Sequence, residues 1–64
     1  MSRAGIVNIL MARDGLSRKD AMDKIEYCSR RLYEEAVPIG SSDLADKIIA
    51  EELGLEPDYL IDLL

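Results

Sequence analysis

The side chains best suited to bind a metal ion in this chain are two carboxylates near its end. Asp58 and Asp62 are four residues apart, a spacing that places both on one face of a helix. Carboxylate oxygens are the ligands that Mg²⁺ and Ca²⁺ prefer, but a calcium-binding loop also needs a central glycine that this segment lacks. The carboxylates of the preceding predicted helix form its solvated face, and we expect no bound metal and no cofactor; they are Asp43, Asp46, Glu51 and Glu52.

The single thiol offers little for catalysis. The chain contains one Cys and no His, so one copy cannot assemble an imidazole base, a His–Cys zinc site or an internal disulfide. Cys28 recurs with Ile25 and Leu32 at helical spacing, which predicts that the thiol packs as a small hydrophobe. We expect a protein that is not an enzyme.

Three cations form a candidate anion contact. Arg18 and Lys19 begin a predicted helix, where positive charge opposes the helix dipole, and Arg13 precedes them across a turn. A phosphate or a partner's carboxylate would relieve this arrangement. The nearby carboxylates of Asp20 and Asp23 can offset this positive charge locally. A surface charge that the fold tolerates is the simpler interpretation.

The same region resembles a helix-turn-helix, in which a second helix enters the DNA major groove. Two positions depart from the pattern: Met11 stands where a small residue is usual, and Asp14 where an apolar one is usual. The chain also has a net charge of −5, which disfavours binding to phosphates. A DNA-binding regulator is thus the alternative function, and nucleic acid is not the expected partner. It would use Arg13, Arg18, Lys19, Arg30 and Arg31.

Glycine, proline and serine residues divide the chain into helical segments. Gly15 and Gly54 are typical helix stops, Pro38 ends a long helical pattern, and Ser17 and Ser41 or Ser42 are suitable caps. At 64 residues there is room for one domain, residues 1–64. We predict an all-α bundle of three main helices, at about 3–13, 18–36 and 43–53, plus a short C-terminal helix at 57–63. The predicted inward stripe of the second helix comprises Ala21, Met22, Ile25, Cys28, Leu32 and Ala36.

Charge is distributed unevenly between the two halves. Residues 1–33 carry seven basic and four acidic side chains, whereas residues 34–64 carry one basic and nine acidic side chains. The halves can neutralise each other within one molecule, or the acidic half can face a basic partner. Both interpretations remain open, and the internal one is the simpler.

Apolar side chains are in excess at the C-terminus. Five of the six residues from 59 to 64 are apolar, and one helical stripe cannot hide them all. A small bundle gains stability by covering such a surface with another molecule, so we expect a protein partner and a homo-oligomer. In the alternative, the terminal helix plugs the open end of its own bundle. The predicted partner or self-association surface comprises Tyr59, Leu60, Ile61, Leu63 and Leu64.

Residues 13–17 (RDGLS) and 52–64 (ELGLEPDYLIDLL) resemble segments of short proteins encoded by phages, prophages and other bacterial mobile elements. The resemblance implies a protein that binds a host protein and blocks or redirects it, and anti-defence inhibitors are one such class. Apolar stretches of four residues or fewer predict no membrane span, and we expect a cytoplasmic location. The expected function is that of a small acidic, non-catalytic interaction protein of phage or prophage origin, with a structural assembly subunit as a further alternative.

Overall fold

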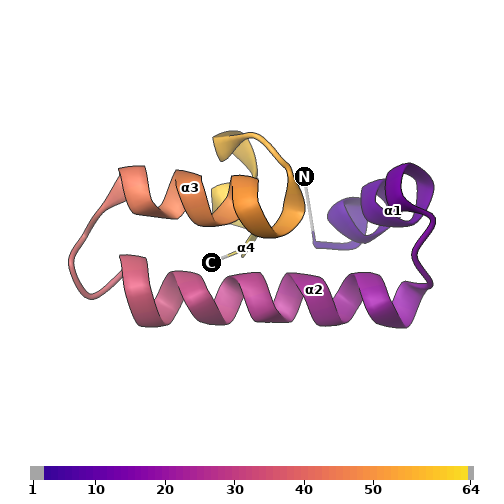
Figure 1. The fold of residues 1–64 in the computed structure, drawn as a ribbon, viewed down its shortest axis with the longest axis horizontal. Coiled ribbons are helices and arrows are strands. Elements are labelled where there is room, and N and C mark those ends of the chain that lie inside the picture. The colour runs from indigo at the N-terminus through magenta and orange to yellow at the C-terminus, as the bar shows by residue number, and fades with distance from the viewer. Residues whose placement is uncertain (1–2, 64) are drawn as a thin grey trace.

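The computed structural model describes residues 3–63, and the predicted all-α fold is confirmed across this range, in which no strand occurs (Figure 1). Three main helices and a short C-terminal one follow the predicted order. The elements in chain order are α1 Arg3–Asp14, α2 Arg18–Arg31, the π-helix η1 Leu32–Ala36, α3 Ser42–Leu53, the 3-10 helix η2 Pro57–Tyr59 and α4 Leu60–Leu63.

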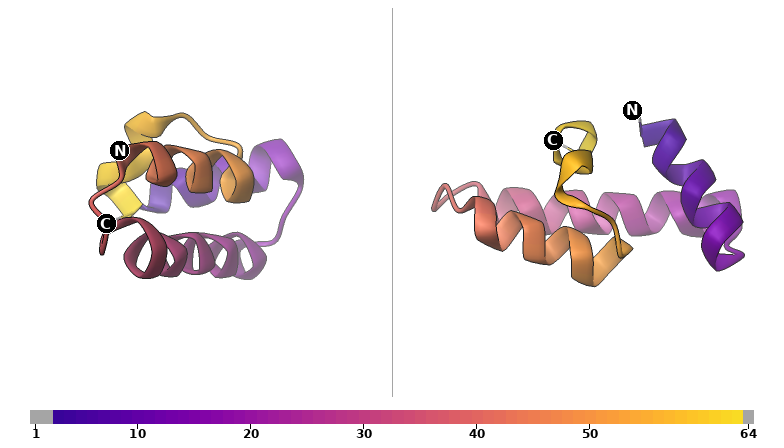
Figure 2. Two further views of the ribbon diagram at one scale, coloured as in Figure 1. Left: turned by 60° about the vertical axis from the view of Figure 1, so that its left-hand side comes forward. Right: turned by 90° about the horizontal axis from the view of Figure 1, so that it is seen from above.

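The long helix α2 is the element on which the others pack. It lies along the longest dimension of a body that measures 33 × 18 × 18 Å (Figure 1). Helix α1 packs against one end of α2 and α3 against the other, and α4 lies behind α3, where it contacts both α2 and α3 (Figure 2). The last helix therefore closes one side of the bundle.

The predicted helix at 18–36 is continuous, but its final part is a π-helix, η1. The Val37 N–H donates to the Leu32 carbonyl oxygen at 2.9 Å, five residues back instead of four. The wider turn keeps Leu32 and Ala36 buried while Val37 is exposed. Such turns are rare and occur frequently at functional sites.

Serine caps and left-handed glycines set the helix ends as the sequence predicts. The hydroxyl oxygen of Ser17 accepts from the Asp20 N–H at 3.1 Å, and that of Ser41 accepts from the Leu44 N–H at 3.1 Å. Gly54 ends α3 with φ of 63°, a conformation in which a Cβ is disfavoured.

The core draws on α1, α2, η1, α3 and α4, whereas η2 contributes no buried residue. One member of the predicted stripe is wrong: Met22 is 51% exposed, because Ala21 and Ile25 take the inward positions of this turn. In α1, Val7 is buried with Ile6 and Leu10. The buried apolar residues are Ile6, Val7, Leu10, Ala21, Ile25, Cys28, Leu32, Ala36, Ala45, Ile48, Ile49, Leu53 and Leu63.

Substitution of Leu63 tests whether the last helix belongs to the core. Because its side chain is fully buried, Leu63→Ala should lower the free energy of unfolding by about 2–5 kcal/mol in chemical denaturation. Ile61→Ala is the matched control, since Ile61 is 85% exposed on the same short helix and should cost less than about 0.5 kcal/mol. Equal small effects of the two substitutions would contradict the packing of α4.

Candidate functional site

The predicted partner surface at the C-terminus is divided between the core and the exterior. Leu63 is buried within the chain itself, so for this residue the prediction of a partner contact is wrong, and α4 acts as a plug. Tyr59 and Leu60 are half-buried and pack against the core. Ile61 is the exposed member of the set among the described residues, and Leu64 lies outside them.

Hydrogen bonds from two other helices hold the end of α4 in place. The Arg3 Nη2 atom donates to the Leu63 carbonyl oxygen at 2.9 Å and to Ser29 Oγ at 3.0 Å. Ser29 Oγ in turn donates to the same Leu63 oxygen at 2.7 Å. A helix end leaves carbonyl oxygens without partners inside the helix, and these donors satisfy one of them. The start, middle and end of the described chain are thereby joined.

The predicted anion contact is not assembled as one site. Arg13 donates to both carboxylate oxygens of Asp14 at 2.9 Å and to the carbonyl oxygens of Leu53 and Gly54, so it caps the end of α3. Its hydrogen bond holds the pKa of Asp14 below the usual value. Arg13 would have to give up these contacts to bind an external anion.

Lys19 and Arg18, the other two cations of the predicted anion contact, lie in different surroundings from Arg13. Lys19 pairs with Asp23 at 3.2 Å, and both side chains are well exposed. Arg18 is exposed and borders a different feature, a cavity of about 260 Å³ between α1 and α2. The wall of that cavity includes two cations, Arg3 and Arg18, and one carboxylate, Glu26.

Arg31 is the strongest link between the basic and acidic halves. Its guanidinium contacts Glu35 at 2.8 Å, Glu52 at 2.7 Å and Glu51 at 3.4 Å. Hydrogen bonding to Arg31 lowers the pKa of Glu35, and the same carboxylates raise the pKa of Arg31. For these side chains the internal interpretation of the charge asymmetry is the one that the structure supports.

The thiol is enclosed and weakly acidic. Cys28 is fully buried. Burial, together with the nearby charge of Glu52, raises its pKa from 9.0 to about 11. That rise lowers the thiolate fraction at neutral pH about 100-fold, so the sulfur packs as an apolar atom, in agreement with the sequence pattern.

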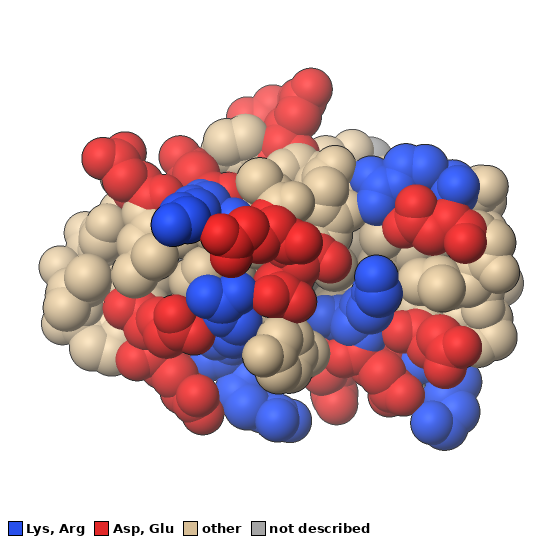
Figure 3. Space-filling view, viewed as in Figure 1, with Lys and Arg blue, Asp and Glu red and all other residues tan. Residues whose placement is uncertain are grey.

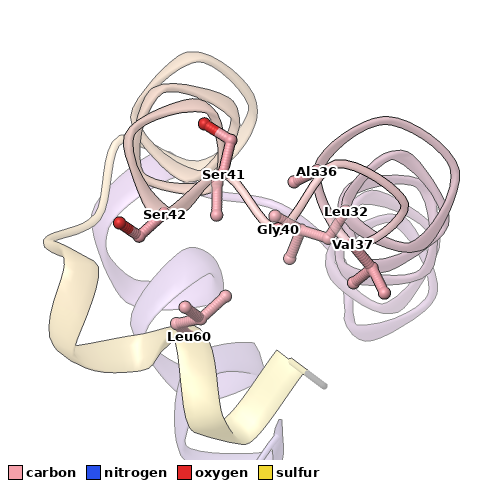
Figure 4. A pocket seen from close by; sticks show the side chains of 8 residues that line it. Leu32, Ala36, Val37, Gly40, Ser41, Ser42 and Leu60 are labelled. Atoms are coloured by element: carbon pink, nitrogen blue, oxygen red, sulfur yellow. The ribbon is translucent and has the colours of Figure 1, made fainter.

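An apolar cavity of about 170 Å³ opens where the π-helix turns into α3 (Figure 4). Leu32 and Leu60 contribute large side chains to its wall, and the remaining positions are mostly small, which leaves the space open. The sequence patterns described above do not predict this cavity. The lining residues are Leu32, Ala36, Val37, Gly40, Ser41, Ser42, Ala45 and Leu60.

Two exposed aliphatic side chains belong to the same region. Val37, in the cavity wall, is 49% exposed, and Ile39, in the adjoining loop, is 70% exposed. The sequence signal available for this region is a pair of aliphatic residues on either side of Pro38, followed by the small residues at 40–42. We call Ile39 together with the cavity-lining residues the apolar end.

Acidic side chains flank the apolar end. Residues 32–46 contain Glu34, Glu35, Asp43 and Asp46 but no Lys or Arg. In the space-filling view the left-hand end of the molecule is largely uncharged, with acidic side chains above and below it (Figure 3). The apolar end therefore lies beside acidic side chains, and the nearest cations along the chain are Arg31 and Lys47, which border this stretch.

Within residues 3–63, no three Cys, Asp or Glu side chains come together in a way that could hold a metal ion. None of the helices in the described part of the chain is long and apolar enough to cross a membrane. Comparison of the chain with protein-family models, curated proteins and solved structures finds no match.

The Arg31 ion pairs predict the response of stability to acid. Because the folded-state pKa of Glu35 lies below 4.5, its contribution is present above that pH and is lost as the pH falls through the folded pKa. Arg31→Gln should reduce the free energy of unfolding at pH 7 and weaken its decline below about pH 5.

Arg30→Gln is the matched control, because it removes the same charge from an exposed position of α2. It should keep the acid dependence of the wild-type protein. Denaturant unfolding across a pH series measures both variants, and an unchanged pH dependence in Arg31→Gln would contradict this role.

Proposed function

We propose that this chain is a small acidic, non-catalytic protein that binds a protein partner through its apolar end. The observation that carries the proposal is exposed Val37 in the wall of an apolar cavity, with exposed Ile39 next to the lining residue Gly40 in the same loop. Single exposed aliphatic residues are ordinary on protein surfaces. Two of them beside a recess that can take a further side chain form the arrangement that interface anchors use.

The free energy for such binding comes from apolar area removed from water. Burial contributes about 25 cal/mol per Å², and a fully buried aliphatic side chain contributes about 1.5–3 kcal/mol. The walls of the recess are built by packed elements, η1, α3 and α4, so it needs little ordering on binding.

The biological setting is part of the proposal and rests on the sequence. The resemblance of residues 13–17 and 52–64 to short phage and prophage proteins supports a bacterial host protein as the partner, in the cytoplasm. Blocking a host defence protein is the specific role that this setting favours. A host surface that handles nucleic acid is basic and would complement the acids around the apolar end.

The DNA-binding regulator receives less support. Two of the five cations it would use, Arg13 and Arg31, make hydrogen bonds within the chain that DNA phosphates would have to displace. Lys19, a third cation, is paired with Asp23. A homo-oligomer formed through the apolar end would bring two acidic surfaces together, so a different, basic protein is the preferred partner.

Affinity purification from a bacterial lysate tests the proposal with three versions of the chain. The wild type should recover a partner, and Val37→Ser combined with Ile39→Ser should reduce that recovery at least about 10-fold, because two apolar contacts are lost without a change of charge. Tyr27→Ser is the control, since Tyr27 is 52% exposed on α2 outside the apolar end. Circular dichroism establishes that each variant is folded.

Equal recovery of the same proteins by all three versions would contradict the proposal, as would recovery of none by the wild type. Sedimentation of the purified chain over a concentration series addresses the homo-oligomer. A dimer that the double serine variant abolishes would assign the apolar end to a second copy instead of a host protein.

A further inference from the structure

We infer that the segment bound by the apolar end is a cationic amphipathic helix, which inserts one aliphatic side chain into the cavity. This inference rests on the proposed function and adds the chemistry of the partner. It follows from three properties of the surface: the size and lining of the cavity, the sign of the surrounding charge and the secondary structure of its walls.

The cavity has the size and polarity for one large apolar side chain. Its volume of about 170 Å³ is similar to that of an engineered dry cavity, roughly 150 Å³, that accepts benzene. Leu32, Ala36 and Leu60 give it apolar walls, while the hydroxyl oxygens of Ser41 and Ser42 point away from the space between Leu32 and Leu60 (Figure 4). A leucine or methionine side chain fits this environment, and a charged group does not.

The charge around the cavity selects the flanking residues of the partner. Within residues 32–46, Glu35 is paired with Arg31, while Glu34, Asp43 and Asp46 have no ion pair with Lys or Arg in the described structure. Lys or Arg residues beside the inserted side chain would be attracted to these carboxylates, whereas Asp or Glu residues would be repelled. A second copy of this chain would meet the cavity with the same acids, which is why a basic segment is the occupant.

The secondary structure of the site favours a helical partner over an extended one. The walls come from η1, α3 and α4 and the loop between the first two, and no strand occurs in residues 3–63 to which an extended peptide could add. A helix satisfies its own backbone hydrogen bonds. With apolar residues one turn apart, it can place one side chain in the cavity and the next against Val37 and Ile39.

Designed peptides provide the probe. The first is an amphipathic helix of leucine and lysine, about 18 residues long. A second replaces every lysine by glutamate, and a third replaces every leucine by alanine. Calorimetric titration of the full chain should detect binding of the first peptide alone, and its affinity should fall several-fold between about 50 mM and about 300 mM NaCl as the charges are screened. Backbone amide NMR shifts should change most in residues 37–45 and at Leu60.

A cavity-filling substitution separates insertion from general attraction to an acidic protein. Ala45→Leu should weaken binding of the leucine–lysine peptide at least 10-fold, because its side chain occupies the space that the ligand needs. Ala50→Leu is the matched control, an exposed position on the same helix outside the cavity. If Ala45→Leu does not fold, Ser42→Leu fills the cavity from an exposed lining position.

The results distinguish this inference from the proposed function. Equal binding of the lysine and glutamate peptides, or wild-type affinity in a folded cavity-filled variant, would overturn the inference. Shifts concentrated around Tyr27 would do the same. If no peptide binds but a captured protein still depends on Val37 and Ile39, the interaction surface stands and the cationic helix is wrong.

Discussion

The fold depends on the return of the chain's last helix to its own core. Leu63 fills an interior position, and its carbonyl oxygen accepts hydrogen bonds from both Arg3 and Ser29. A bundle of this length has little apolar area to bury, so one fully buried leucine is a substantial part of its stability. The same return places Leu60 across the apolar cavity from Leu32 of the π-helix, where Leu60 forms part of the wall (Figure 4). The packing of α4 therefore also shapes the candidate site.

The uneven charge of the sequence has two consequences in the structure: contacts within the chain, and an acidic surplus at the apolar end. Arginines of the basic half bind groups of the acidic half: Arg3 and Arg13 cap the ends of α4 and α3, and Arg31 contacts Glu35, Glu51 and Glu52. Apart from the Arg31–Glu35 pair, which is four residues apart on one continuous helix, each of these contacts joins segments far apart in the chain or supports the end of a helix. The acids of residues 32–46 other than Glu35 have no ion pair with Lys or Arg in the described structure within 4.0 Å. Internal neutralisation thus leaves an acidic surplus at the apolar end, where it can influence the choice of partner.

Much of the fold follows from short-range signals, and the site does not. Ser17, Gly15 and Gly54 act through their own hydrogen bonds or backbone conformation, so their roles can be predicted from neighbouring residues alone. The inward position of Leu63 depends on where α4 lies relative to α2 and α3, and an apolar tail has the same pattern whether it meets its own core or another molecule. The π-turn at Leu32 and the cavity likewise arise from packing between elements. In the sequence, the π-turn and the cavity are indicated only by small residues around a loop that contains two exposed aliphatic side chains.

Hydrogen–deuterium exchange of the free chain and of its complex with a captured partner tests the central claim most directly. The account predicts that added protection is concentrated in residues 37–45 and around Leu60, while the exchange of α1 is unchanged. Protection centred on the exposed face of α2 around Tyr27, or on the first turn of α2 at Arg18 and Lys19, would contradict the assignment of the apolar end as the binding surface.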